Sequence, residues 1–257
     1  MILLDPQARP VVGHRGNRAH APENTLPSFA QAVALGADAV ELDLHLSSDG
    51  VLMVIHDPSL ERTTDGAGAV AAHTAQALQR LDAGAGFSRD GGRSHPWRGR
   101  GVVIPRFDQL VEALPSTLPL IIELKTAAAA PALLAAVRRH ALQRRVIVAG
   151  FDRASTAPLR DAGFALGACQ REVAALLPFA LLGRDPGPLP YRALCIPPRW
   201  HGLPLPVAAF ARALRRRGGC THVWTVNDPA QAQALWRADV QGIISDDPAA
   251  ILAVRGR

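Results

Sequence analysis

Short runs of aliphatic and β-branched residues alternate with amphipathic segments rich in alanine and leucine along most of the chain. The short runs predict nine strands, at residues 10–14, 39–46, 51–56, 118–125, 145–151, 164–169, 193–196, 222–226 and 242–245. Apolar positions at helical spacing predict helices at residues 26–35, 74–81, 131–142, 207–217 and 229–238. Because strands that alternate with helices form parallel βαβ units, the pattern favours a parallel sheet covered by helices.

The number of strands and the length of the chain favour a closed barrel. The chain has 257 residues, and an ordinary (β/α)₈ barrel has about 250, so we expect an α/β fold of the TIM-barrel type. One strand candidate is then extra. Asp49-Gly50 is a hairpin signal, so residues 51–56 form either a barrel strand or the antiparallel partner of residues 39–46. A doubly wound sheet is the competing fold, but no glycine-rich phosphate loop opens the first crossover.

One long segment interrupts this alternation. Residues 63–105 are rich in glycine and contain only a short helical stretch that begins after Thr74. A segment of this length is too long for an ordinary connection between two elements. We therefore expect an inserted loop or small subdomain around residues 63–105, lying over one end of a barrel, within a single domain that spans residues 1–257.

The composition limits the kinds of partner that the protein is expected to bind. The net charge is +6, and 27 of the 28 basic residues are arginine, so Lys125 is the single lysine. The arginines are spread along the chain and do not alternate with aromatic residues, which argues against a nucleic-acid surface. Charged residues, proline or glycine interrupt every apolar stretch before it reaches the roughly 18 residues of a membrane span, so we expect no stable membrane anchor. A small-molecule ligand is the partner that remains.

The cysteines and the first residues of the chain indicate the cellular compartment. Cys169, Cys195 and Cys220 show no spacing typical of zinc ligands or of a disulfide framework. The first residues, Met1 to Pro6, lack the basic region and the long apolar run of a secretory signal. We expect a reducing, cytoplasmic setting. The number of subunits stays open.

Charged residues inside otherwise apolar strands are the first candidates for chemistry. Glu41 and Asp43 are two residues apart in one predicted strand, so both project from the same face, and Glu123 and Lys125 share a face in another strand. Burying an unpaired charge costs several kcal/mol or more. Three carboxylates at strand ends therefore need a shared cation, for which an all-oxygen set favours Mg²⁺, Ca²⁺ or Mn²⁺. The alternative is an ion-pair network with Arg15 and Lys125.

Two histidines occupy similar positions. His14 and His56 each end a predicted strand, which is where barrel enzymes place catalytic residues. Imidazole can donate and accept protons near neutral pH, so the two form a candidate acid–base pair. We expect the other seven histidines, including His20, His73, His95 and His201, to be exposed on loops or helices. Trp224 either faces the mouth of the barrel or packs in the core.

These residues lie in a series of motifs that resembles the glycerophosphodiester phosphodiesterase family. The motifs follow the family's order over nearly the whole chain: His14-Arg-Gly, Pro22-Glu-Asn-Thr25, Val40-Glu-Leu-Asp43, Ser48-Asp-Gly50, His56-Asp57, Leu60-Glu-Arg-Thr63, Ile104-Pro105, Ile122-Glu-Leu-Lys125, Trp224-Thr-Val-Asn227 and Gly242-Ile-Ile-Ser-Asp-Asp-Pro248. The resemblance implies a TIM barrel whose insertion falls at residues 63–105. It also implies an enzyme that hydrolyses glycerophosphodiesters to glycerol 3-phosphate and an alcohol with the help of a divalent cation.

The resemblance also implies roles for individual residues. Three groups of residues follow: the metal ligands Glu41, Asp43 and Glu123; the acid–base pair His14 and His56; and the substrate-binding residues Arg15 and Lys125 at the phosphate and Trp224 at the glycerol or the barrel mouth. A phosphodiester gains negative charge in the transition state, so fixed positive groups suit the reaction. The nucleophile is either water or the neighbouring glycerol hydroxyl. We expect Glu23 and Asn24 to support the site and cap the helix at residues 26–35.

The sequence departs from the family pattern mildly. Gly150-Phe151 stands where members often have Ser-Phe, Arg106-Phe107 where Thr-Leu is more usual, and residues 182–206 match poorly. The poorly matched segment is expected to shape one wall of the substrate mouth, so the leaving alcohol stays open. Two other functions remain: a phospholipase C or lysophospholipase D type of phosphodiesterase on the same fold, and a phosphate-binding barrel without catalysis. Loss of a histidine or a ligand would indicate the second, and none is lost.

Overall fold

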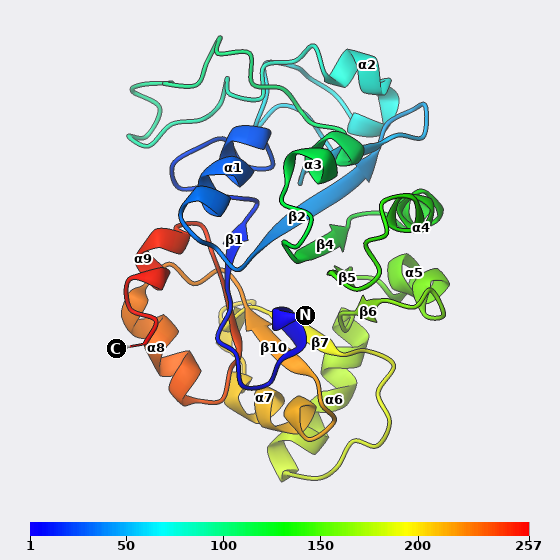
Figure 1. Cartoon of the computed structure of the whole chain (residues 1–257), viewed down its shortest axis with the longest axis vertical. Coiled ribbons are helices and arrows are strands. Elements are labelled where there is room, and N and C mark those ends of the chain that lie inside the picture. Colours follow the sequence, from blue (N-terminus) through cyan, green and yellow to red (C-terminus); the bar gives the residue numbers. More distant parts are fainter. Residues whose placement is uncertain (257) are drawn as a thin grey trace.

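Eight parallel strands form a nearly closed barrel in the computed structural model, which describes residues 1–256 (Figure 1). Around the barrel the strands are β6 (Ala165–Leu166), β5 (Val146–Ala149), β4 (Leu120–Leu124), β2 (Ala39–Leu46), β1 (Val11–His14), β11 (Gly242–Ser245), β10 (Cys220–Val223) and β7 (Ala193–Ile196). A parallel bridge between Gly167 and Ala193 connects β6 to β7. The predicted TIM barrel is confirmed, and the doubly wound alternative is wrong.

The ninth strand candidate is a hairpin partner. Strand β3 (Leu52–Val54) runs antiparallel to β2, with Leu44 opposite Val54. The turn between them uses Gly50, whose φ of 77° is easily adopted only by glycine. Residues 51–56 therefore leave the barrel and direct His56 back toward the end of β2.

Four of the predicted helices form at the expected places around the barrel, and a short one lies in the insertion. They are α1 (Leu26–Ala34), α2 (Ala75–Leu78), α4 (Ala130–Arg139), α7 (Val207–Arg215) and α8 (Pro229–Arg237). The sequence pattern did not predict α3 (Phe107–Ala113), α5 (Arg153–Thr156), α6 (Gln170–Leu182) and α9 (Pro248–Leu252), nor the hairpin of β8 (Arg199–Trp200) and β9 (Leu203–Pro204). In the part of the chain that the structure describes, no helix is long and apolar enough to cross a membrane.

The two faces of the barrel strands have different surroundings. Outward residues such as Leu42, Leu44 and Leu124 pack against the helices in the main apolar core. Inward residues fill the lower barrel with a second apolar cluster, which Leu3 of the short 3₁₀ helix η1 (Ile2–Leu4) closes from below. Figure 1 shows η1 across the centre of the ring. The inward positions above this layer belong to Glu41, Asp43 and Glu123 and are therefore polar.

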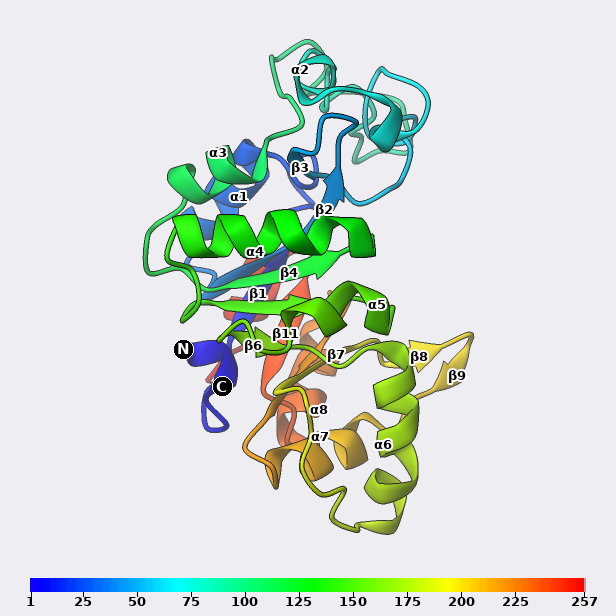
Figure 2. The same cartoon turned by 90° about the vertical axis from the view of Figure 1, so that its right-hand side faces the viewer.

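The segment between β3 and α3 has an apolar cluster of its own. Leu60, Val70, Leu78 and Ile104 pack together there with Met53 of β3. Figure 2 shows this segment at the top, beyond the ends of β2 and β3. The insertion expected around residues 63–105 is present, and it is anchored to the hairpin rather than to a barrel strand.

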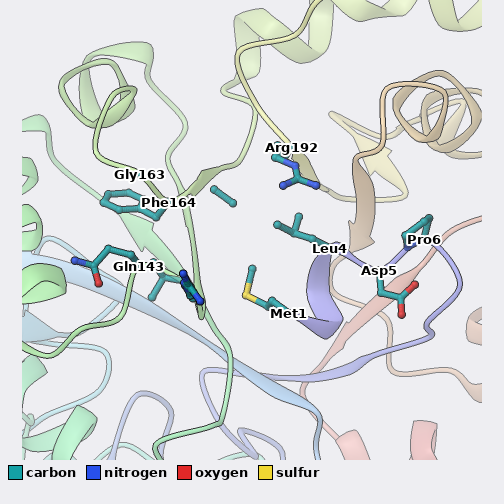
Figure 3. Close-up of a pocket in the computed structure, with 11 residues that line it drawn as sticks. Met1, Leu4, Asp5, Pro6, Gln143, Gly163, Phe164 and Arg192 are labelled. Atoms are coloured by element: carbon teal, nitrogen blue, oxygen red, sulfur yellow. The ribbon is translucent and has the colours of Figure 1, made fainter.

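A cavity of about 700 Å³ lies at the opposite end of the barrel from the charged residues (Figure 3). Its lining includes Met1 and Leu4 at η1, and Phe164 and Arg192 beside the amino ends of β6 and β7. In TIM barrels the carboxyl ends of the strands hold the chemistry. This cavity is therefore a feature of the floor of the barrel.

Two histidines expected to be exposed are instead buried. His45 on β2 and His222 on β10 are 7% and 0% exposed, because both lie on strands rather than on loops or helices. His222 donates from Nε2 to the carbonyl oxygen of Leu3 at 2.9 Å. A Cβ at Gly242 would overlap its imidazole, so glycine is needed there. Burial lowers the pKa of His222 to about 4.

Acidification is expected to destabilise the protein through His222. Its pKa is about 4 in the folded chain and about 6.5 in the unfolded chain, so the unfolded state binds the proton more readily between these values. The free energy of unfolding should fall by up to about 3 kcal/mol as the pH drops from 6.5 to 4. Urea unfolding at several pH values measures this slope.

Two variants show whether His222 or other titratable groups cause this pH dependence of the free energy of unfolding. His222→Gln should flatten the slope between pH 6.5 and 4, while the same change at exposed His201 should leave it as in the parent protein. An unchanged slope in His222→Gln would show that other groups cause the acid sensitivity.

Candidate active site

Charged side chains from several strands meet at the carboxyl end of the barrel. The register of the sheet sets their heights, because His14 pairs with Glu41 across β1 and β2, and Asp43 pairs with Glu123 across β2 and β4. In Figure 2 the arrowhead of β4 points to this end, and the hairpin β8–β9 projects on the same side. Residues far apart in sequence thus reach one small volume.

Three carboxylates form the centre of the site: Glu41 and Asp43 are buried and Glu123 is half-buried. Glu41, Asp43 and Glu123 each place an oxygen within 4.8 Å of the others. Lys125 Nζ lies 2.8 Å from Asp43 Oδ1 and also contacts Glu123 Oε1, and Arg15 Nε lies 3.1 Å from Asp43 Oδ2. The carboxylate cluster and the ion-pair network, which the sequence offered as alternatives, therefore use the same residues.

The pKa values of the three carboxyl groups are shifted in different directions. Burial, reinforced by the charge of Asp43, raises the pKa of Glu41. Burial also raises the pKa of Glu123 more than Lys125 lowers it. Burial acts in the same direction on Asp43, but there Lys125 and Arg15 outweigh it, so the pKa of Asp43 is lowered. Asp43 is the carboxylate that the protein's own cations stabilise.

The cluster has the donor set of a site for a hard divalent cation. All three groups offer oxygen, which Mg²⁺, Ca²⁺ and Mn²⁺ prefer. The raised pKa of Glu41 shows that the cations nearby do not fully compensate its charge. A divalent ion would supply further positive charge here, so the residues fit such a group.

A tight turn after β1 positions Arg15. Arg15 and Gly16 have φ angles of 52° and 88°, and a side chain on Gly16 would collide with Ser28 of α1. The hydroxyl of Ser28 donates to the carbonyl oxygen of Arg15 at 2.9 Å. The amide nitrogen of Arg15 donates to Glu41 Oε2 at 3.1 Å. The turn thus directs both the backbone and the guanidinium of Arg15 into the cluster.

His14 is held by the carboxylate of Asp246, the residue that follows the last barrel strand. Its Nδ1 lies 2.6 Å from Asp246 Oδ1, and its Nε2 lies 3.9 Å from Glu41 Oε2. Asn227 Nδ2 donates to Asp246 Oδ2 at 3.1 Å. Asp246 fixes the orientation of the ring and leaves Nε2 directed toward the cluster.

His56 has a corresponding arrangement on the other side. Its Nδ1 lies 2.6 Å from Asp57 Oδ1. Arg62 donates to Asp57 from Nε at 2.5 Å and to Glu23 from Nη1 at 2.8 Å. The hydrogen bond from Arg62 lowers the pKa of Asp57 to about 2. Burial lowers the pKa of His56, which favours the neutral imidazole near pH 7.

Trp224 lies at the barrel mouth beside an apolar groove. The cavity there has a volume of about 740 Å³, and Glu123 and Trp224 both line it. The rings of Phe151 and Trp224 meet edge to face with centroids 6.3 Å apart, and Trp200 stacks on Phe151 at 6.3 Å. Trp224 lines this groove and also packs against the apolar cluster inside the barrel, so it combines the two positions expected for it.

Sequence reasoning missed or misplaced some residues of this site. Asn24 was expected to cap α1, but Thr25 is the N-cap and forms no side-chain cap bond, whereas Asn24 Nδ2 donates to Asp43 Oδ2 at 2.8 Å. Asp246 follows β11 directly, so its place at a strand end was a usable signal. The partnership of Arg62 with Glu23 spans 39 residues and left no local pattern.

Comparisons with known proteins identify the family of the chain. The family model described as "Glycerophosphoryl diester phosphodiesterase family" matches residues 14–250. A glycerophosphodiester phosphodiesterase from Caldanaerobacter subterraneus is 29% identical, and the match covers 94% of this chain and 96% of the relative. One from Bacillus subtilis is 28% identical, over 96% of this chain and 86% of the relative.

Solved structures give the same picture. A glycerophosphodiester phosphodiesterase from Agrobacterium tumefaciens has a TM-score of 0.74 and 30% identity, with 96% of this chain and all of that chain covered. A phosphodiesterase from Oleispira antarctica, solved with the product sn-glycerol-3-phosphate, has a TM-score of 0.78 and 24% identity over 96% of both chains, a likeness of fold. With the family model matching nearly its whole length, the chain belongs to the glycerophosphoryl diester phosphodiesterase family.

Proposed function

We propose that this chain is a metal-dependent enzyme that hydrolyses glycerophosphodiesters to sn-glycerol 3-phosphate and an alcohol. The observation that carries the proposal is one buried to half-buried cluster in a chain of this family: three carboxylates, two fixed cations and two carboxylate-held histidines. The names of the relatives support the reaction, and the product bound to the Oleispira antarctica protein supports a small glycerol phosphate ligand.

The phosphate is proposed to bind between the cluster and the two cationic side chains. A phosphodiester is a monoanion that gains negative charge in the transition state. Arg15 and Lys125 are proposed to stabilise this charge, because both are cationic and are held beside the cluster. A divalent cation held by Glu41, Asp43 and Glu123 would supply further charge neutralisation at the phosphoryl oxygens. Trp224 is proposed to pack against the glycerol.

Proton transfer is proposed to involve the two histidines. Each has Nδ1 on an aspartate, so Nε2 is the atom that exchanges a proton. One imidazole accepts the proton of the attacking hydroxyl, and the other donates a proton to the leaving alkoxide. The attacking hydroxyl is that of water or of the neighbouring glycerol carbon.

Two further proposals concern the chain as a whole. We propose a single domain, because the first barrel strand pairs with the last and the insertion begins and ends beside one hairpin. We propose a cytoplasmic location, because Cys169, Cys195 and Cys220 are all free thiols, as is usual in a reducing compartment.

Release of glycerol 3-phosphate tests the reaction and the metal together. Glycerophosphocholine, glycerophosphoethanolamine and glycerophosphoglycerol should all yield glycerol 3-phosphate in a coupled assay. Dialysis against EDTA should lower the rate by roughly 100-fold or more, because charge stabilisation at the phosphate is lost. Adding back Mg²⁺, Ca²⁺ or Mn²⁺ should restore it. Full activity after EDTA treatment would contradict the metal dependence.

Substitution of the histidines tests their role. His14→Ala and His56→Ala should each lower kcat by about 10²–10⁴-fold, the usual contribution of a positioned acid or base. Circular dichroism should show that both variants stay folded, and exposed His201→Ala serves as the control with parental kcat. If His14→Ala and Glu41→Ala both hydrolysed the substrate at the parental rate, the site would lie elsewhere.

A further inference from the structure

The aspartates that hold the two candidate acid–base histidines each accept a hydrogen bond from an arginine. Arg18 Nη1 donates to Asp246 Oδ1 at 3.4 Å. Arg62 Nε donates to Asp57 Oδ2 at 2.5 Å. The first aspartate holds the histidine at the end of β1, and the second holds the histidine that follows β3. The polar contacts of each histidine therefore continue beyond its aspartate to a cation.

Glu23 joins these two arginines. Arg18 Nε donates to Glu23 Oε2 at 2.9 Å, and Arg62 donates to both oxygens, from Nη1 at 2.8 Å and from Nη2 at 2.7 Å. Burial alone would raise the pKa of this carboxyl group, but the arginines around it outweigh burial, so its pKa lies well below the ordinary value. Glu23 is therefore charged near pH 7, and an unbroken chain of ion pairs connects one histidine to the other.

Backbone contacts place Arg18 between two loops at the carboxyl end of the barrel. The amide nitrogen of Ala19 donates to the carbonyl oxygen of Asp246 at 2.9 Å, and that of Asn17 donates to the carbonyl oxygen of Ser28 on α1 at 3.0 Å. The loop after β1 is thereby attached both to the loop after β11 and to α1. The planar guanidinium offers several donors in a fixed fork, so one side chain can hold a carboxylate on each side.

We propose that Arg18 is a positioning residue that couples the two histidines, because it holds Asp246 on one side and Glu23 on the other. The proposal rests on the proposed function, in which both histidines transfer protons. The ion pairs of Arg18 are with carboxylates that hold other protein groups, so it acts on the reaction through those groups. A change at Arg18 therefore reaches both His14 and His56.

Nuclear magnetic resonance of the imidazole nitrogens tests the coupling without turnover. In protein with isotope-labelled histidine and Mg²⁺ present, the ring resonances of His14 and His56 are assigned by their loss in His14→Ala and His56→Ala. At a single pH, Arg18→Met should move the resonances of both histidines, because it breaks the chain between them. Arg18→Gln, which keeps a polar side chain but not the charge, is a second variant with the same expected result.

An arginine with a similar ion pair elsewhere provides the matched control. Arg215 lies 3.1 Å from Asp239, and its side chain is 37% exposed, against 34% for Arg18. It ends α7, which leads into the amino end of β10. Arg215→Met removes a surface ion pair of the same kind and should leave the resonances of His14 and His56 in place.

Steady-state kinetics separate positioning from substrate binding. Arg18→Met should lower kcat for glycerophosphocholine about tenfold, as is usual when a residue that orients a functional group is lost. KM should stay at the parental value, and the loss in kcat should be the same for glycerophosphoethanolamine. In the His14→Ala and His56→Ala backgrounds the same substitution should lower kcat by a smaller factor, because one of the two groups that it positions is absent.

The outcomes separate this proposal from the proposed function. Unmoved resonances of either histidine in Arg18→Met, or equal shifts in Arg215→Met, would overturn the coupling. A rise in KM that differs between head groups, with kcat unchanged, would show that Arg18 binds the leaving alcohol and would overturn it too. If the parent protein released no glycerol 3-phosphate, the proposed function would fail, and the resonances would still support or overturn the coupling by themselves.

Discussion

The charge of Asp43 is the constraint on which the site depends. Its side chain is 1% exposed, and an isolated carboxylate at such a depth would cost several kcal/mol. Lys125, Arg15 and Asn24 compensate it from three different places: the end of β4, the turn after β1 and the segment before α1. The positions of these three elements are thereby coupled to the two carboxylate oxygens of Asp43. A one-residue shift of β4 would take Lys125 away from Asp43, and a shift of β1 would take Arg15 away, so the fold and the site are specified together.

Period-two patterns in the strands made much of this predictable from the sequence. Positions 41 and 43 alternate with leucines, and the structure buries the leucines against helices while the carboxylates face the barrel interior. The same rule, applied to position 45, would have placed His45 inside, where it is found. Position 45 lies in the same predicted strand, so the alternation indicates an inward side chain there as well.

Other features were not predictable from local pattern. Helix α6 has apolar residues on several sides, with Phe179, Leu181 and Leu182 exposed, so the helical spacing that reveals a buried face is weak. The partnership of His14 with Asp246 spans 232 residues and exists only because β1 and β11 are neighbours in the closed barrel. Such contacts follow from topology, which a single strand pattern does not contain.

The arginine at position 62 has a consequence for how this fold can vary. It lies beyond β3, near the start of the inserted segment, yet it joins Asp57, the partner of His56, to Glu23, which also holds Arg15. The segment beyond β3 is therefore coupled to the active-site end of the barrel through Arg62. A chimera that exchanged the whole segment between β3 and α3, which includes Arg62, would keep the contacts of Asp57 and Glu23 only if the incoming segment also carried an arginine that reaches Glu23.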